Sequence, residues 1–206
     1  MTKVISVQIY PWKKPRDFIL GQGEYVVDDT VIVEEEKRIE AGIVKSKARE
    51  IDESKLEESL GIIVRKATSQ DLKKIKAHEA KKAESLDICR RLIKKHKLLM
   101  KIVDIKFSFD GSQITFAFIA DGRVDFRKLV KDLSRRFQRS IRLEQIGSRD
   151  EATIMGGYGI CGRPLCCAGF LKEKQGISLD LAKIQQMAHR GSERITGVCG
   201  RLMCCL

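Results

Sequence analysis

Two nearly identical cysteine motifs constrain the chemistry of this chain more than any other feature. GGYGICGRPLCC runs from Gly156 to Cys167, and VCGRLMCC, at an offset of 38 residues, ends at Cys205. Each motif reads Cys-Gly-Arg, then two further residues, then Cys-Cys. The motifs hold six of the seven cysteines, which are the candidate ligands of a metal site: Cys161, Cys166, Cys167, Cys199, Cys204 and Cys205.

The spacing of these cysteines favours one kind of metal site over others. Thiolates are soft ligands that bind zinc, copper(I) and iron–sulfur clusters. Structural zinc prefers cysteines separated by about two to four residues, because adjacent side chains diverge from a single ion. A cluster spreads several irons over a few ångströms, so neighbouring cysteines can each bind a different iron. Nearby glycines would let backbone N–H groups approach sulfur, and Arg163 and Arg201 would favour thiolates. We therefore expect an iron–sulfur cluster, with structural zinc or redox-active thiols as the alternatives.

Three disulfides would also use six cysteines, and they are usual in small secreted domains. The first residues, MTKVISVQIYPWKK, contain no long apolar segment and no small-residue cleavage site, so we expect no signal peptide. No apolar run approaches the ~20 residues needed to cross a bilayer. We therefore expect a cytoplasmic protein, in which clustered cysteines more often bind metal or act in catalysis.

The C-terminal segment resembles a known family. GSRDEA (Gly147 to Ala152), GGYGICGRPLCCAGFL (ending at Leu171) and CGRLMCCL (ending at Leu206) are similar to the RicT, or YaaT, family of bacterial regulatory proteins with a PSP-type C-terminal domain. The resemblance implies a subunit of a three-protein complex with small helical partners, RicA-like and RicF-like. It also implies that this complex carries 4Fe-4S clusters and modulates ribonuclease Y in mRNA processing and, in spore formers, development. Relatives usually continue past the second motif, whereas this sequence stops at Leu206.

Charge divides the chain into segments. The net charge is +12, but residues 1–60 carry −3, residues 61–146 carry +12 and residues 147–206 carry +3. We expect an α+β protein with a small β module at 1–60 and a PSP-type C-terminal domain at 61–206. That domain would comprise a long basic helix and an α+β unit at 61–146, followed by the double cysteine motif at 147–206.

The first segment is predicted to form a small closed β-barrel or sheet. Stretches rich in β-branched residues predict its strands, at residues 4–10, 30–36 and 39–47. The segment between the first two strands is punctuated by Pro11, Pro15, Gly21 and Gly23, which predicts a loop.

One long helix is predicted over residues 68–98. Thr68 and Asp71 have the spacing of a capping box. Apolar residues recur at helical spacing and are expected to be buried: Leu72, Ile75, Ala83, Leu86, Cys89 and Ile93. Because Cys89 belongs to this stripe, we expect it to be a core residue and not a ligand.

The other faces of this helix are basic. A solvated surface is the default interpretation, and the excess of +12 in residues 61–146 favours the alternative, a face that binds RNA or an acidic partner. The candidate residues for that face are Lys73, Lys74, Lys81, Lys82, Arg90 and Arg91.

Residues 101–146 predict a strand-strand-helix-strand unit. Asp110-Gly111 is a strong hairpin signal between strands at 101–110 and 114–120. Asp125 can cap a helix, and a third strand follows at 140–147. The helix is expected to end at Phe137 and to bury Phe126, Leu129, Val130, Leu133 and Phe137.

A further helix is predicted between the cysteine motifs. Ser178 can cap it, and it would run over residues 179–188. His189, at its end, is expected to interact with the helix terminus rather than to bind metal.

The sequence contains no pattern typical of catalysis. The three histidines lie far from any serine or cysteine nucleophile pattern, and there is no phosphate-binding Gly-x-x-x-x-Gly-Lys. We therefore expect a non-enzymatic iron–sulfur regulatory subunit, and the resemblance implies RNA processing as its process. The alternatives are a redox-sensing protein that uses the Cys-Cys pairs as dithiols and a free-standing nucleic-acid-binding protein with structural zinc. Each motif offers three cysteines, so a four-iron cluster would either borrow a ligand from a partner chain or span both motifs.

Overall fold

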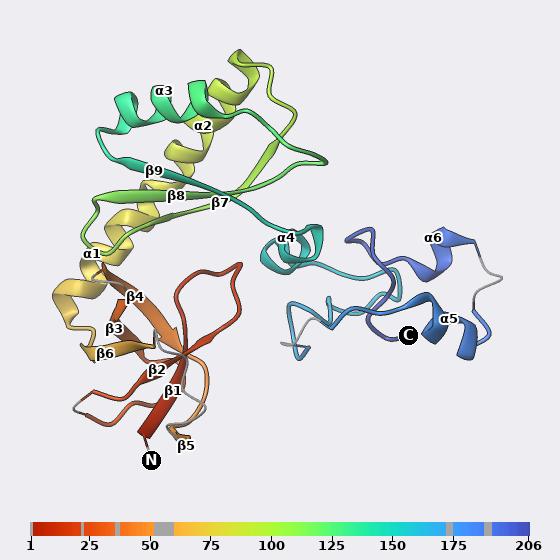
Figure 1. The fold of residues 1–206 in the computed structure, drawn as a ribbon, viewed down its shortest axis with the longest axis horizontal. Coiled ribbons are helices and arrows are strands. Elements are labelled where there is room, and N and C mark those ends of the chain that lie inside the picture. The colour runs from red at the N-terminus through yellow and green to blue at the C-terminus, as the bar shows by residue number, and fades with distance from the viewer. Residues whose placement is uncertain (1, 22, 36–37, 52–59, 172–174, 188–190) are drawn as a thin grey trace. The chain divides into compact units, whose positions relative to one another are not determined.

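The fold consists of two compact units, residues 1–144 and residues 145–206, in a computed structural model. The structure describes residues 2–21, 23–35, 38–51, 60–171, 175–187 and 191–206. Sheets dominate the first unit, and the cysteine motifs lie in the second (Figure 1). None of the described helices is both long and apolar enough to span a bilayer.

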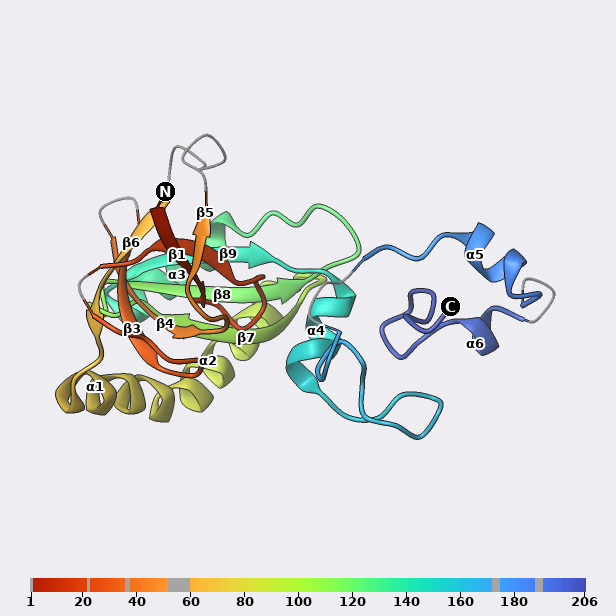
Figure 2. The ribbon, with the colours of Figure 1, turned by 90° about the horizontal axis from the view of Figure 1, so that it is seen from below.

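A small closed barrel begins the first unit, as predicted. Its strands are β1 (Thr2–Gln8), β2 (Arg16–Ile19), β3 (Thr30–Glu35), β4 (Arg38–Val44) and β6 (Gly61–Lys66), with β5 (Arg49–Ile51) paired to β1 outside the ring. The ring closes in the order β1-β2-β6-β3-β4-β1, and its strands wrap round one another (Figure 2). Alternate apolar side chains fill the interior: Ile5, Val7, Ile9, Phe18, Val31, Val33, Val44 and Ile63.

The strand β2 lies in the segment that was predicted to be a loop. It has four residues, of which only Phe18 is fully buried, so it is too short to show an alternating pattern in the sequence. Its parallel partner β6 begins at Gly61, where a Cβ would lie 2.5 Å from the Phe18 ring and 2.6 Å from the Glu34 carbonyl oxygen. Glycine at position 61 therefore allows the barrel to close.

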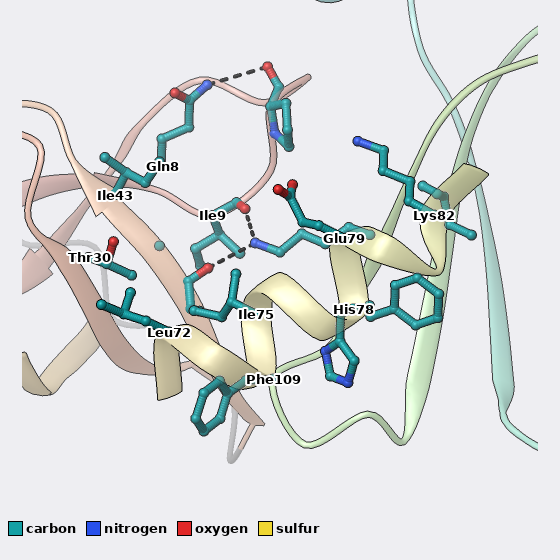
Figure 3. Close-up of a pocket in the computed structure, with 16 residues that line it drawn as sticks. Gln8, Ile9, Thr30, Ile43, Leu72, Ile75, His78, Glu79, Lys82 and Phe109 are labelled. Carbon is teal, nitrogen blue, oxygen red and sulfur yellow. Dashed lines mark hydrogen bonds between the residues drawn. The ribbon is translucent and has the colours of Figure 1, made fainter. Parts of the chain in front are cut away.

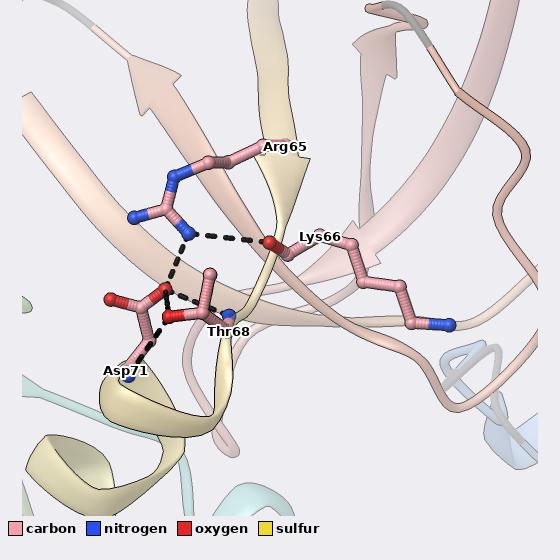
Figure 4. Close-up of polar contacts among 4 residues, drawn as sticks. All are labelled: Arg65, Lys66, Thr68 and Asp71. Carbon is pink, nitrogen blue, oxygen red and sulfur yellow. Dashed lines mark hydrogen bonds and ion pairs between the residues drawn. The ribbon is translucent and has the colours of Figure 1, made fainter.

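The predicted capping box is confirmed at the start of α1 (Ser69–Ala80). Thr68 Oγ1 accepts a hydrogen bond from the Asp71 amide at 3.3 Å, and Asp71 Oδ2 accepts one from the Thr68 amide at 2.8 Å (Figure 4). The Arg65 guanidinium also donates to Asp71 and, with Thr68, holds the pKa of that carboxyl well below its usual value. The box thus fixes the passage from β6 into α1.

The helix predicted over 68–98 is in fact two helices, α1 and α2 (Lys82–Lys95), which follow one another as a bent pair (Figure 2). At the bend, the Lys81 amide bonds to the His78 carbonyl at 3.2 Å, and Ser85 Oγ donates to the Lys81 carbonyl at 2.8 Å. These bonds interrupt the α-helical ladder. Of the residues predicted to be buried on this stripe, Cys89 and Ile93 are buried, whereas Leu72, at 40%, and Ala83 are exposed, contrary to the prediction.

An α+β layer completes the first unit. The strands β7 (Lys101–Phe107), β8 (Gln113–Ile119) and β9 (Ser140–Gln145) form a sheet in that order. The helices α2 and α3 (Arg127–Phe137) lie side by side over one face of it, and His96 Nε2 is 3.0 Å from Asp132 Oδ2 between them (Figure 1). The core between helices and sheet contains Cys89, Ile93, Ile102, Ile105, Ile114, Phe116, Phe118, Leu129 and Leu133.

Two local predictions in this layer are confirmed. Cys89 is fully buried, and its burial raises the pKa of its thiol to about 12. The Asp110-Gly111 turn joins β7 to β8, and Gly111 has a φ of 74°, a conformation that glycine adopts without steric cost. The sequence pattern therefore located both the hairpin and a structural cysteine.

Two lysine side chains stabilise the α+β layer, and one of them joins it to the barrel. Lys106 on β7 donates to the backbone carbonyls of Ile9 and Ala41, the latter at 2.8 Å (Figure 3). Burial lowers the pKa of Lys106 to about 8. Lys82 forms an ion pair of 2.6 Å with the buried Asp104. Beside Lys106, a pocket of about 390 Å³ is lined by the barrel, α1 and β7.

In its described part, the second unit contains three short helices, α4 (Ser148–Met155), α5 (Leu179–Ile184) and α6 (Ser192–Ile195). The helix predicted over 179–188 ends four residues early, because Gln186 adopts a φ of 54° and the Met187 amide bonds back to the Ala182 carbonyl at 2.8 Å. His189 lies outside the described residues.

Candidate metal centre

The two cysteine motifs fold into the same local structure. Tyr158 and Pro164 form an isolated antiparallel bridge in the first motif, and Thr196 and Leu202 form the equivalent bridge in the second. In both motifs the glycine after the bridge residue donates its N–H to an arginine carbonyl at 2.8 Å. The sequence repeat is therefore a structural repeat, and we call each copy a cysteine hairpin (residues 157–167 and 195–205).

Each cysteine hairpin turns at a glycine. Gly162 and Gly200 both have a φ of 73°, a conformation that side chains with a Cβ rarely adopt. Their amides bond to the carbonyls of Gly159 and Gly197 at 3.0 and 2.9 Å. A Cβ at Gly159 would lie 3.5 Å from Cys161 Sγ, so the backbone runs close beside that sulfur. The glycines thus set the shape of the hairpin that presents the thiols.

All six predicted ligands line one pocket. The pocket has a volume of about 80 Å³, and both hairpins contribute to its wall. Within it Cys166, Cys167, Cys199 and Cys204 are partly buried, whereas Cys161 and Cys205 are exposed. All seven cysteines of the chain are free thiols. The fold therefore brings together the ligand set that the sequence singled out and keeps Cys89 apart from it.

The partly buried thiols influence one another electrostatically. Burial raises the pKa of the Cys204 thiol, and the neighbouring Cys167, Cys199 and Cys166 raise it further. Arg149 acts in the opposite direction. Four thiolates so close together would repel one another, and a bound metal centre relieves such repulsion because it supplies positive charge.

Arg149 is the residue of this site that our sequence reasoning did not select. It lies in the first turn of α4, is 4% exposed and lines the cysteine pocket. Its Nη1 donates to the Gln175 carbonyl at 2.8 Å, while its buried Nε has no hydrogen-bond partner among the described residues. Arg149 belongs to the GSRDEA segment of the family resemblance, and that segment is the signal that could have identified it.

The residues present fit a metal–thiolate centre. Six soft sulfur donors surround a pocket, and a buried cation with an unpartnered N–H lies beside them. Among the described residues, no three His, Cys, Asp or Glu side chains converge closely enough to hold one ion. The thiols line one pocket without converging on one point, and a cluster that spreads several irons does not require them to converge.

The predicted basic residues do not form one uniform set. Lys73 and Lys74 lie on α1, where the Lys74 ammonium is 5.8 Å from the centre of the Phe109 ring. Lys81 is exposed at the bend. Lys82 is held by its ion pair with Asp104, so it has a structural role.

Arg90 and Arg91 belong to a broader basic surface on α2 and α3. Together with Asp87 and Lys94, they line a shallow depression on α2. The neighbouring helix adds the exposed side chains of Arg127, Lys128, Lys131, Arg135 and Arg136. In the described part of the chain, α2 and α3 carry no exposed large hydrophobic side chain. We call the combined exposed surface of these two helices the basic face.

Comparisons with known proteins agree with this architecture. The PSP1 C-terminal conserved region matches residues 61–146, and the third domain of PSP1-like proteins matches residues 176–206. The chain is 43% identical to the stage 0 sporulation protein YaaT of Bacillus subtilis (strain 168) over 161 residues, which cover 78% of this chain and 58% of YaaT. It is 32% identical over 71 residues to an uncharacterized protein of Schizosaccharomyces pombe (strain 972), covering 34% of this chain and 10% of that protein. No solved structure matches the chain.

The fold and the paired cysteine hairpins define a PSP1-type protein. Because the identity to YaaT extends over 78% of this chain, the chain belongs to the YaaT/PSP1 family. The chain spans less than two thirds of the length of the curated relatives that it matches.

Proposed function

We propose that this chain is a non-enzymatic regulatory subunit that holds an iron–sulfur cluster between its two cysteine hairpins. The observation that supports this proposal most directly is the single pocket lined by all six cysteines of the repeat. When bound, the cluster would supply a redox- and oxygen-sensitive link between the hairpins. The hairpins themselves provide the thiolates and hold them through fixed glycine turns.

The pattern of burial supports a particular division of the six cysteines. A four-iron cluster takes four cysteine ligands. Four thiols are partly buried around the pocket: Cys166, Cys167, Cys199 and Cys204. These four would hold one cluster that spans both hairpins, and the exposed Cys161 and Cys205 would stay available to a partner chain. A ligand borrowed from a partner remains the competing arrangement.

The process that we propose for the subunit rests on the family resemblance. YaaT is named as a stage 0 sporulation protein, and this chain shares 43% of aligned residues with it. We propose that the chain assembles in the cytoplasm with RicA-like and RicF-like helical subunits. The assembly would modulate ribonuclease Y-dependent mRNA processing and, in spore formers, development. In this scheme the free energy of binding the cluster contributes to the stability of the assembly. Loss of the cluster to oxygen would therefore release the partners.

The basic face supports a second element of this function, direct contact with RNA. Phosphate backbones are bound by arrays of Lys and Arg without an apolar centre, whereas protein interfaces usually have an apolar core. The basic face combines many exposed cations with no exposed large hydrophobic side chain among the described residues. It therefore suits RNA better than an acidic protein.

The test is metal and sulfide analysis of the full chain purified without oxygen, together with its absorption spectrum. The proposal expects iron and sulfide in near-equal amounts. One cluster held by four cysteines of this chain should form on the isolated chain, whereas a ligand borrowed from a partner should leave binding weak until RicA-like and RicF-like subunits are added. Size-exclusion chromatography in air should then show the partners dissociating. Zinc without sulfide would support the structural-zinc alternative. Thiol turnover without iron would support the redox alternative. A full, air-stable cluster on the isolated chain would exclude ligands shared with partners.

A further inference from the structure

Arg149 places a buried positive charge beside the cysteine pocket. Arg149 is 4% exposed and lines the pocket that the six thiols surround. Removing an ionised group from water is costly unless an opposite charge and hydrogen bonds replace the lost hydration. A position of this kind therefore needs a counter-charge in the functional state of the protein.

The described residues that line the cysteine pocket offer few sources of negative charge for Arg149. Its hydrogen bond goes from Nη1 to the Gln175 carbonyl, which is a dipole and carries no net charge. The described residues that line the pocket include no Asp or Glu. Cysteine thiols are the acidic groups of the pocket wall, and the Arg149 charge acts on Cys204 among them. Negative charge beside Arg149 can therefore come from thiolates.

Two states of the cysteines would leave this cation without a partner. Neutral thiols carry no charge, and neither do disulfides. Metal-bound thiolates differ, because a cluster or ion with four thiolate ligands keeps a net negative charge. The free Nε–H of Arg149 is a donor of the kind that forms a hydrogen bond to metal-bound sulfur.

We propose that Arg149 is the built-in counter-charge of the cysteine pocket, pairing with the negative charge of metal-bound thiolates. This inference rests on the proposed function and deepens it. Arg149 is a positioning residue in this scheme, since the sulfur ligands bind the metal and the guanidinium stabilises their charge. Adding an electron makes the centre more negative, so the buried cation favours the reduced form. Arg149 would thus set the potential at which the centre takes up an electron.

The first test compares stability with and without metal, read by hydrogen exchange of amides in residues 145–206 of the full chain. Arg149→Met removes an unpaired buried cation from the metal-free protein, so exchange there should be equal to wild type or slower. In the metal-loaded protein the same change removes the counter-charge, so exchange should be faster. A purely structural role, through the hydrogen bond to Gln175, predicts faster exchange in both states and would overturn the inference.

The second test measures the reduction potential of the iron-loaded protein. We expect Arg149→Met to reduce the equilibrium constant for one-electron reduction about tenfold, a shift of about 59 mV to lower potential. Arg149→Lys keeps the charge and should recover most of that shift. Arg163→Met is the matched control, because Arg163 lines the same pocket but is exposed and screened by water.

The outcomes separate this inference from the proposed function. If the wild type binds iron but Arg149→Met and Arg163→Met shift the potential equally, the cluster site stands and the role of Arg149 is overturned. If the wild type binds no iron under any condition, the proposed function fails. Amide hydrogen exchange of the metal-free wild type and Arg149→Met then tests the role of Arg149. Faster exchange in metal-free Arg149→Met would overturn the counter-charge inference there as well.

Discussion

The two units of this chain bury cysteine in opposite ways. In the first unit, Cys89 lies in an apolar core between helices and a sheet, where burial raises its pKa to about 12 and keeps the thiol neutral. In the second unit, six thiols surround a small pocket beside a buried arginine. The comparison shows that burial keeps a lone cysteine neutral and unreactive, whereas grouped thiols beside a cation offer the soft donors that a metal would need.

The units also differ in what stabilises them. The first has two apolar cores, one inside the barrel and one under α2 and α3. In the described part of the second, the hydrophobic side chains that are buried are Ala182 and Ile195. Large side chains there, such as Phe170 at 80% and Ile184 at 75%, are exposed. Small domains with so little core are commonly stabilised by a bound metal or a partner, and we expect the same of this unit.

The largest expected effect comes from the cysteines themselves. Cys166→Ser or Cys204→Ser should remove most of the bound iron, because each replaces a soft thiolate at the pocket. Cys89→Ser should keep its iron but cost about 1–3 kcal/mol of unfolding free energy, because a hydroxyl replaces a buried thiol. Iron analysis and urea unfolding would measure the two effects. Equal iron loss in all three variants would contradict the contrast between the units.

Removal of metal should affect one unit and not the other. After anaerobic chelation, amide hydrogen exchange should become much faster in residues 145–206, because the small core there cannot replace the metal. Exchange in residues 2–144 serves as the internal control and should stay unchanged. A uniform increase along the whole chain would show that the stability of both units depends on the metal.

Charge reversal tests the basic face of the first unit. Arg90→Glu combined with Arg91→Glu should weaken RNA binding about tenfold or more at low salt. It should also reduce the salt dependence by roughly one unit of slope for each phosphate that the protein no longer neutralises. Fluorescence anisotropy with labelled RNA is the measurement. Lys3→Glu with Lys47→Glu, on exposed barrel positions, is the control with the same change in charge. Equal weakening of RNA binding in both variants would show that the net charge of the protein, and not the basic face, explains the effect.

The pair Lys73→Glu and Lys74→Glu extends this test to α1. Both side chains are exposed, so the reversal should leave the fold intact. We expect RNA binding to weaken less than in the Arg90 and Arg91 variant. The reason is that α3 lies beside α2 and adds its exposed cations to that surface. Lys82 is unsuitable for this purpose, since its reversal would leave the buried Asp104 without its partner.

The smallest expected effect concerns Lys106 and pH. Its pKa falls from the usual 10.5 to about 8 in the folded protein, so between these pH values the unfolded chain binds more protons. Wild-type stability should therefore rise with pH from 8 to 10.5, relative to Lys106→Met, by about 2 kcal/mol. Urea unfolding followed by fluorescence of the single tryptophan, Trp12, reports on this unit. Lys128→Met, at an exposed position, should show no such dependence; a similar rise there would argue against the buried-amine explanation.

The sequence by itself determined the features that depend on short spacing. It located the capping box at Thr68 and Asp71, the hairpin at Asp110-Gly111 and the core position of Cys89. It also identified the six cysteines, because a repeated motif is visible without any fold. These features are local, since each follows from residues a few positions apart whose periodicity or turn chemistry has one favoured structure.

Tertiary structure alone decided the remaining features. It brought the two cysteine hairpins to one pocket, buried Arg149 beside them and divided the long helix at Lys81. It also paired Lys106 with barrel carbonyls that lie 97 and 65 residues earlier in the chain. No local pattern encodes these contacts, because they depend on which distant surfaces meet and on how much water their meeting excludes. The free energy of a buried charge or a bent helix is set by that environment and not by the residue's neighbours in sequence.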